Sequence, residues 1–317
     1  MRTIKEKKIG FCILCKSKKQ IFYSYGFDYE SQTCKNKWTF KECEDCGHIQ
    51  LDPRPSKSEL DTIYPHNYYS YELSNKITPF ILAGKNFLDQ IKINLIIKNL
   101  KCELRSYMDV GCGDGKFLKL LEKKYQIKPE KIYGVELNEG LVKQLKKENY
   151  VAINSSIENI KRIKTSSISL ITMFHVIEHV SDPKIVIKKL SKWLSKGGVL
   201  AIETPNVSSI DAQLFGKTFW GGYHFPRHWH LFNEKTLSKL LKECGINPIK
   251  ISYQTGHSFW MFSFHHLALY NFKNKKIAKL FNPLKSILLL IFFTLFDKTR
   301  AFLGAKTSSI LIIGQKI

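Results

Sequence analysis

The sequence predicts an α/β protein with a Rossmann-like, doubly wound and mostly parallel sheet, a cysteine-bearing module before it and a helical insertion before the last strand. Two C-x-x-C pairs occur within the first fifty residues. From residue 105 onward, short apolar segments alternate with amphipathic ones, as in a sheet that helices cover on both faces. About fifty residues then separate the last two strand-like segments.

Four cysteines near the N-terminus have the spacing of a zinc ribbon. Two C-x-x-C pairs lie 27 residues apart, at Cys12, Cys15, Cys43 and Cys46. Each pair can direct two thiolates at one tetrahedral Zn²⁺, and short strand-like segments lie between the pairs. A redox C-x-x-C is normally single and set in a βαβ context, which is missing here. We therefore expect a zinc ribbon over residues 1–55 with a structural Zn²⁺, and we regard Cys34 and His48 as bystanders.

Residues 56–104 are expected to form a helical connector. Two prolines, Pro53 and Pro55, end the ribbon. Residues 56–64 have a capping pattern for a short helix, with Ser56 followed three residues later by Glu59. Apolar residues recur at helical spacing over 78–100, which predicts a longer helix leading into the main domain.

The main domain is expected to span residues 105–256, with strands and helices in alternation. The expected strands are 107–110, 131–136, 168–174, 198–203 and 248–253. The expected helices are 117–124, 139–148, 183–194 and 234–244. Asn233 caps the last of these helices and Gly245 stops it. A final strand within 308–317 is expected to join the same sheet after the insertion at 257–307.

A glycine-rich turn, DVGCGDG at 109–115, falls where the first strand ends and the first helix begins. Doubly wound sheets bind ligands at this position, because glycine lets the backbone approach the ligand and the helix N-terminus offers free N–H groups. Glu136 ends the next strand, where its carboxylate can accept hydrogen bonds from a ribose diol. The spacing lacks the third glycine of a dinucleotide site, so an adenosine carrying an amino acid fits better than a pyrophosphate.

The sequence here resembles the class I S-adenosylmethionine (SAM)-dependent methyltransferases. The matching stretches are DVGCGDGKFLKLL from Asp109, GVELNEG from Gly134, LITMFHVIEHVSDP from Leu170 and KGGVLAIETPN from Lys196. The resemblance implies a SAM site in which the glycines pass the methionine moiety, Glu136 binds the ribose and residues 156–157 lie beside adenine. The cofactor-binding residues it implies are Asp109, Gly111, Gly113, Asp114, Glu136, Leu137, Ser156, Ile157, Phe174 and His175.

The order of ribbon, LDPRPS, YPHNYYSY and this domain resembles methyltransferases of bacterial surface polysaccharide and modified-sugar biosynthesis. This resemblance implies O-methylation of a sugar or a lipid-linked saccharide. Sugar C-methyltransferases share the layout but usually carry a further C-terminal domain, which puts C-methylation in doubt. A quinone-like or prenylated small molecule is the alternative acceptor.

Histidines and aromatic residues crowd into 220–232, after the fourth strand and before the next helix. Methyl transfer needs alignment of the acceptor and, for a hydroxyl, a base, which histidine supplies near neutral pH. We expect His230 or His228 to be this base. Lid packing against the nearby tryptophans is the structural alternative, and a second metal is not expected because the segment holds no acid. The candidate catalytic residues are His230, His228, His224, Tyr223 and Arg227.

Two histidines and a glutamate in 175–179 match the sequence pattern H-x-x-E-H of some zinc proteases. Their place after a buried strand argues against a zinc protease, which needs the motif inside a helix. In the methyltransferases that this chain resembles, the stretch lines the mouth of the cofactor and substrate site. A structural role for His175 and His179 is nearly as well supported.

The net charge and the insertion at 257–307 indicate whether the protein binds nucleic acid or a membrane. The chain carries 50 Lys and Arg against 27 Asp and Glu, a net charge of +23, but the lysines are dispersed and no RNA-binding signature occurs. An RNA-modifying protein is thus the weaker hypothesis. A cytoplasmic location is expected because the N-terminus has no apolar signal segment. The basic, apolar insertion 257–307 is expected either to lie at the inner face of an anionic membrane or to pack internally or in a homodimer.

Overall fold

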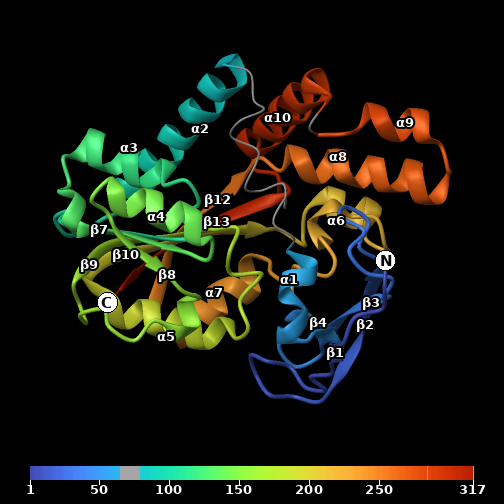
Figure 1. Ribbon diagram of the computed structural model, residues 1–317, viewed down its shortest axis with the longest axis horizontal. Coiled ribbons are helices and arrows are strands. Elements are labelled where there is room, and N and C mark those ends of the chain that lie inside the picture. Colours follow the sequence, from blue (N-terminus) through green and yellow to red (C-terminus); the bar gives the residue numbers. More distant parts are fainter. Residues whose placement is uncertain (65–78, 284, 317) are drawn as a thin grey trace.

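A computed structural model describes residues 1–64, 79–283 and 285–316, with side chains in the first long helix described from Leu82 onward. The aromatic stretch YPHNYYSY lies almost entirely outside the described residues. The remaining segments form a sheet domain, an N-terminal module beside it and a helical insertion above it (Figure 1).

Seven strands form the central sheet, in the order β12-β13-β10-β9-β6-β7-β8. Five strands, from β6 to β10, run parallel, whereas β13 is antiparallel to both neighbours. This mixed, doubly wound order confirms the predicted fold class. The strands are β6 (Tyr107–Val110), β7 (Ile132–Glu136), β8 (Val151–Asn154), β9 (Ile168–Phe174), β10 (Leu194–Pro205), β12 (Ile246–Gln254) and β13 (Ser309–Lys316).

Helices cover both faces of this sheet, and a separate apolar cluster fills each interface (Figure 1). Leucine and isoleucine side chains of α2 (Pro79–Ile97), α3 (Lys116–Tyr125) and α4 (Glu139–Lys147) pack on one face. Those of α5 (Pro183–Trp193) and α7 (Glu234–Glu243) pack on the other. Local sequence fixes where these helices begin: the Asp182 side chain accepts from two backbone N–H groups of α5, and Asn233 forms a capping box on α7.

The N-terminal module is a four-stranded antiparallel sheet in the order β11-β4-β3-β2. Three of its strands come from the ribbon: β2 (Gln20–Gly26), β3 (Trp38–Cys43) and β4 (Ile49–Leu51). The fourth, β11 (His230–Leu231), belongs to the histidine-rich segment 220–232 and pairs with β4. That segment therefore joins the module to the sheet domain. A short pair, β1 (Glu6–Lys7) with β5 (Arg54–Pro55), and the turn of helix α1 (Leu60–Ile63) complete the module.

The described part of the insertion between β12 and β13 contains the helices α8 (His257–His266), α9 (Lys275–Leu280) and α10 (Ile287–Phe302). The sequence predicted that the insertion is helical, but not how many helices it forms. A π-helical turn, Leu267–Asn271, continues α8. A smaller helix, α6 (Ile210–Phe215), packs against α8 through Phe215 and Phe264, whose ring centroids are 5.0 Å apart. Of the helices in the described ranges, none is long and apolar enough to cross a membrane.

Candidate active site

The four predicted zinc ligands come together in the N-terminal module. The sulfur atoms of Cys12 and Cys46 are 3.5 Å apart, as are those of Cys15 and Cys43, and all four lie within 4.8 Å of one another. Tetrahedral Zn–S bonds of about 2.3 Å place sulfurs about 3.8 Å apart, so the cluster fits Zn²⁺. Four thiolates fill the coordination sphere, as in structural rather than catalytic zinc sites.

The glycine-rich turn connects β6 to α3 and leaves room for a ligand. Gly113 has a φ of +53°, and a Cβ there would meet nothing within 4 Å. The Glu136 carboxylate at the end of β7 accepts hydrogen bonds from the backbone N–H groups of Gly113 at 3.0 Å, Leu137 at 2.7 Å and Asn138 at 2.9 Å. These bonds fix a half-buried carboxylate beside open space, which is what binding of a ribose diol requires.

Other residues implied to bind SAM have different surroundings. Asp109 is buried, accepts a hydrogen bond of 2.6 Å from the Thr172 hydroxyl, and has a pKa that burial raises to about 7. Gly111 also has a positive φ, and a Cβ there would clash with a Val176 methyl group at 2.4 Å. Four further residues of this set differ in exposure: Asp114 and Leu137 are exposed, Ser156 is half-buried and Ile157 packs in the core.

Charged side chains converge where β9 and β10 end. His175 follows β9 with a φ of +54°, and its ring nitrogens lie 3.5 Å from Glu178 Oε1 and 3.5 Å from Glu203 Oε1. The same Glu203 carboxylate pairs with Lys92 Nζ of α2 at 2.5 Å. Lys92 also lies over the ring of Phe174, 4.9 Å from its centroid. Both carboxylates are buried, whereas the His175 side chain is 42% exposed.

The ion pairs in this cluster shift the pKa values of its side chains. Burial opposes a charge on His175, but Glu178 and Glu203 outweigh it and raise the pKa of the imidazole to about 9. Burial likewise opposes a charge on Glu203, yet Lys92 and His175 hold the pKa of that carboxyl well below its usual range. The pKa of Lys92 is raised because Glu203 outweighs its burial. His175 is therefore protonated at neutral pH, held between two ionised carboxylates, and becomes a neutral base as the pH approaches about 9.

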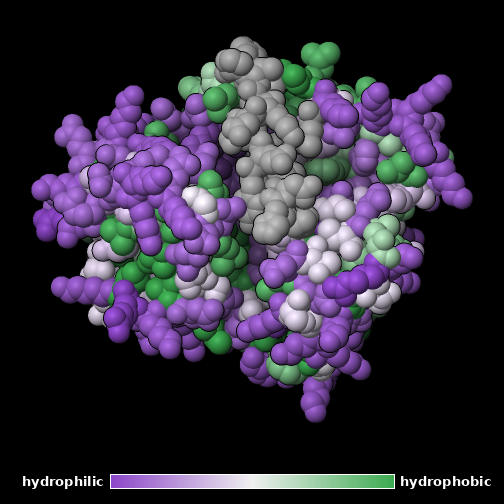
Figure 2. Space-filling view, viewed as in Figure 1, coloured by the Kyte–Doolittle hydropathy of each residue, from purple (hydrophilic) through white to green (hydrophobic). Residues whose placement is uncertain are grey.

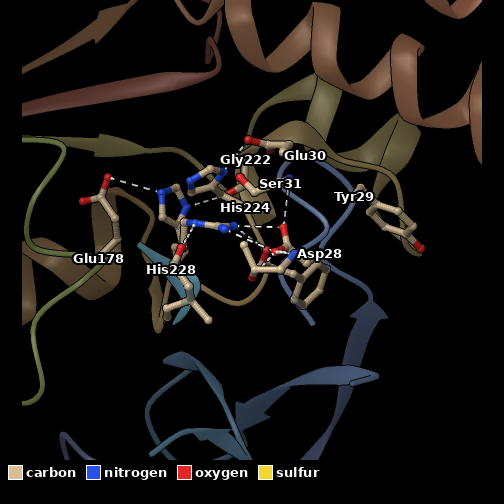
Figure 3. Close-up of polar contacts among 12 residues, drawn as sticks. Asp28, Tyr29, Glu30, Ser31, Glu178, Gly222, His224 and His228 are labelled. Carbon is tan, nitrogen blue, oxygen red and sulfur yellow. Dashed lines mark hydrogen bonds and ion pairs between the residues drawn. The ribbon is translucent and has the colours of Figure 1, made fainter. Parts of the chain in front are cut away.

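The predicted catalytic residues of segment 220–232 are instead buried at the junction with the N-terminal module (Figure 3). His224 Nδ1 lies 2.5 Å from Glu30 Oε2, and the Arg227 guanidinium donates two hydrogen bonds to the Asp28 carboxylate, at 2.9 and 3.2 Å. The hydroxyl of the buried Tyr223 donates to a backbone carbonyl in the loop after α6. The contacts of His224 and Arg227 hold this segment to the N-terminal module.

His230 is 1% exposed and both of its ring nitrogens are engaged. Its Nε2 donates to the Val180 carbonyl at 3.1 Å, so its Nδ1 accepts from His48 Nε2 at 3.0 Å. Burial lowers the pKa of His230 well below its ordinary value. This placement argues against His230 as the base, and it makes His48 a packing partner of His230.

His228 is also buried, but it faces the charged cluster. Its Nδ1 bonds the Gly222 carbonyl at 2.8 Å, and its Nε2 points at Glu178 Oε1 from 3.9 Å (Figure 3). His179 Nδ1 bonds the Arg227 carbonyl at 3.0 Å. Ligand atoms of Glu178, His179 and His228 lie within 4.8 Å of one another, a set that could hold a cation. The expectation that no acid accompanies these histidines is therefore corrected: Glu178 does, from the H-x-x-E-H stretch.

Sequence reasoning missed several charged residues of these sites. Lys92 carried a signal, a lysine within an otherwise apolar helical stretch, and Glu203 carried one as an acid at the end of a buried strand. Asp28 and Glu30 carried no signal, because their partners lie almost 200 residues away in the chain.

Comparisons with known proteins identify the family of the sheet domain. A family model described as "Methyltransferase domain" matches residues 71–251. The ubiquinone biosynthesis O-methyltransferase of Coxiella burnetii is 26% identical over 133 residues, which cover 39% of this chain and 55% of that protein. Its namesake from Xanthomonas oryzae pv. oryzae is 26% identical over 125 residues, covering 38% and 51%. The chain thus spans about half the length of these curated relatives.

Two solved structures are similar as well. A SAM-dependent methyltransferase from Archaeoglobus fulgidus has a TM-score of 0.47 at 18% identity, covering 75% of this chain and 100% of that one. Geranyl diphosphate C-methyltransferase from Streptomyces coelicolor A3(2) has a TM-score of 0.48 at 11% identity, covering 75% and 82%.

Proposed function

This chain belongs to the methyltransferase domain family and is a SAM-dependent methyltransferase, and we propose that it methylates a hydroxyl group of a small or lipid-linked acceptor. The observation that carries the proposal is His175, a half-exposed imidazole between two buried carboxylates at the carboxyl end of the sheet. A hydroxyl gives up its proton when it is methylated, and a positioned histidine can take that proton.

The glycine-rich turn and the end of β7 would hold SAM. The open face of Gly113 admits the ligand close to the backbone, and Glu136 offers its carboxylate to the two ribose hydroxyls. The exposed Leu137 side chain, next along the chain, is available to cover the adenine ring. When bound, SAM supplies a methyl group that its sulfonium makes electrophilic.

His175 would act on the acceptor. Glu178 and Glu203 orient its ring from two sides, and their charge raises the proton affinity that a base needs. The imidazole takes the hydroxyl proton while the oxygen accepts the methyl group from sulfur. The two carboxylates then stabilise the imidazolium that results. We therefore assign the base to His175 in place of His228 or His230, which are buried.

Two acceptor classes deserve direct comparison. The layout of ribbon and sheet domain supports a saccharide carried on a lipid, and the ubiquinone biosynthesis O-methyltransferases among the relatives support a quinol-like hydroxyl. Both acceptors carry a hydroxyl that a base must deprotonate. We propose the lipid-linked saccharide as the methyl acceptor, and a prenylated catechol as the alternative acceptor.

A product assay tests the proposal. The zinc-loaded protein is incubated with SAM and, separately, with polyprenyl-linked saccharides, prenylated catechols and bulk RNA, and S-adenosylhomocysteine and methylated product are measured by mass spectrometry. We expect product with one of the first two acceptor classes, and less product from the Glu136→Ala variant when SAM is limiting, because that variant should bind SAM more weakly. Methylation of RNA alone, or product on carbon or nitrogen, would overturn the proposal.

A further inference from the structure

Helix α10 presents a stripe of exposed apolar side chains on its outer face. Leu288, Phe292, Leu295 and Phe302 are between 56% and 90% exposed. Their spacing of four, three and seven residues places them on one side of the helix. Single exposed apolar residues are ordinary, but a row that runs the length of a helix marks a surface that meets something else.

The inner side of the same helix is firmly packed, so the outer stripe is part of the native surface. Phe293 stacks on Trp260 of α8 with ring centroids 5.7 Å apart. The buried Asp297 carboxylate accepts hydrogen bonds from the Gly256 backbone N–H at 2.8 Å and from Trp260 Nε1 at 3.2 Å. These contacts fix which side of α10 faces outward.

Neighbouring helices add apolar residues. Ile277 and Leu280 of α9 are 47% and 57% exposed, and Phe87 and Ile91 of α2 are exposed as well. Figure 2 shows hydrophobic residues at the upper edge of the molecule, over the ends of α2 and α10. We call the outer stripe of α10 together with Ile277 and Leu280 the docking face.

Exposed positive charge lies at one end of the docking face. Residues 257–307 contain eight Lys and Arg and one acid, Asp297, which is buried and bonded. Five of the lysines are exposed around α9 and at the start of α10: Lys273, Lys275, Lys276, Lys279 and Lys285. Such a cluster complements anionic lipid headgroups, and apolar side chains beside basic ones are typical of helices that lie in a membrane interface.

The length of α10 and the charge beside it distinguish binding to a membrane surface from spanning a bilayer and from a homodimer. A helix of 16 residues is about 24 Å long, shorter than the roughly 30 Å of a bilayer core, so α10 can lie in the interface but cannot span it. A second copy of this chain, with its net charge of +23, complements the exposed lysines less well than an anionic surface does. Charge therefore favours a membrane over a homodimer at this face.

We infer that the docking face binds the surface of an anionic bilayer, with α10 lying parallel to it. Phe259 of α8 contacts the His175 ring, with centroids 6.2 Å apart, so the helix that carries the docking face is packed on the helix that borders the candidate base. Binding would bring the rim of the active site to the membrane. The inference does not depend on which hydroxyl is methylated.

Vesicle flotation of the full, zinc-loaded chain tests the inference. The vesicles are phosphatidylcholine alone or with a third of phosphatidylglycerol, at low and high salt. We expect the protein to float with the anionic vesicles at low salt, and to do so much less at high salt or with phosphatidylcholine alone. Leu288→Ser with Phe292→Ser and Leu295→Ser should lower the floating fraction at least about tenfold.

A matched control replaces exposed apolar residues elsewhere. Phe22→Ser with Ile185→Ser and Leu214→Ser changes side chains of similar exposure, 54% to 66%, outside the insertion, and should leave flotation unchanged. SAM binding, measured by calorimetry, shows that each variant is folded. A variant that binds SAM but does not float has lost only membrane binding, whereas loss of SAM binding would point to the methyltransferase site.

Three results would overturn the inference. The unaltered chain could fail to float with anionic vesicles at low salt. The triple serine variant of α10 could float as well as the unaltered chain. Light scattering could instead show a dimer that the same variant converts to monomers, which would make a second copy the partner.

Discussion

Replacing Glu136 with Ala tests the cofactor site through one side chain. Its carboxylate is held by three backbone N–H groups at 2.7–3.0 Å and would accept both ribose hydroxyls of SAM. Hydrogen bonds to a charged group contribute about 1.5–3 kcal/mol each. Losing the net value of even one ribose bond weakens binding at least tenfold, since about 1.4 kcal/mol corresponds to a factor of ten.

Calorimetric titration with SAM and with S-adenosylhomocysteine measures this loss without any acceptor. Glu139→Ala is the matched control, because it removes an exposed acid three residues away whose partner is Lys143 on the same helix. Glu136→Gln keeps one acceptor oxygen and should lie between the two. If Glu136→Ala binds SAM as tightly as the unaltered chain, the ribose does not bind at the end of β7 and the assignment of the site is refuted.

Three other predictions follow from the structure. Because neutral imidazole is the base, kcat should rise with pH up to about 9 and then level off. His175→Gln should lower kcat by about 10²-fold and abolish this rise. A kcat that does not change with pH in the unaltered chain would show that His175 is not the base. Breaking the buried pair with Asp28→Ala should cost about 3–5 kcal/mol of stability, seen as a lower thermal midpoint, and adding Arg227→Met should recover part of it; an unchanged midpoint would mean that the pair does not join the two parts. Metal analysis should find one Zn²⁺ per N-terminal cluster, lost in Cys43→Ser with Cys46→Ser; zinc retained by that double variant would exclude the four-cysteine site.

Much of the sheet domain could be predicted because its signals are local. A buried strand followed by a glycine-rich turn and an amphipathic helix indicates one βα unit, and each cap or stop residue lies within a few positions of the helix it bounds. The exception is β8, a four-residue edge strand, whose sequence VAIN has neither the length nor the continuous apolar character of the central strands.

The candidate site was harder to predict because burial decides which histidines can act. The sequence favours His230 over His175 as the base, yet β11 pairs with the N-terminal module and buries His230, while His175 directly follows β9 and is half-exposed. The acids that anchor segment 220–232, Asp28 and Glu30, lie in the ribbon. No local pattern connects residues so far apart, so only the fold reveals the junction.

Nuclear magnetic resonance of the purified product, formed from SAM with an isotope-labelled methyl group, shows directly which atom of the acceptor is methylated. We expect the labelled carbon on an oxygen of a lipid-linked saccharide or prenylated catechol and S-adenosylhomocysteine in equal amount. We also expect His175→Gln to slow the formation of both. A label on carbon or nitrogen, or an undiminished rate in that variant, would contradict transfer to a hydroxyl with His175 as the base.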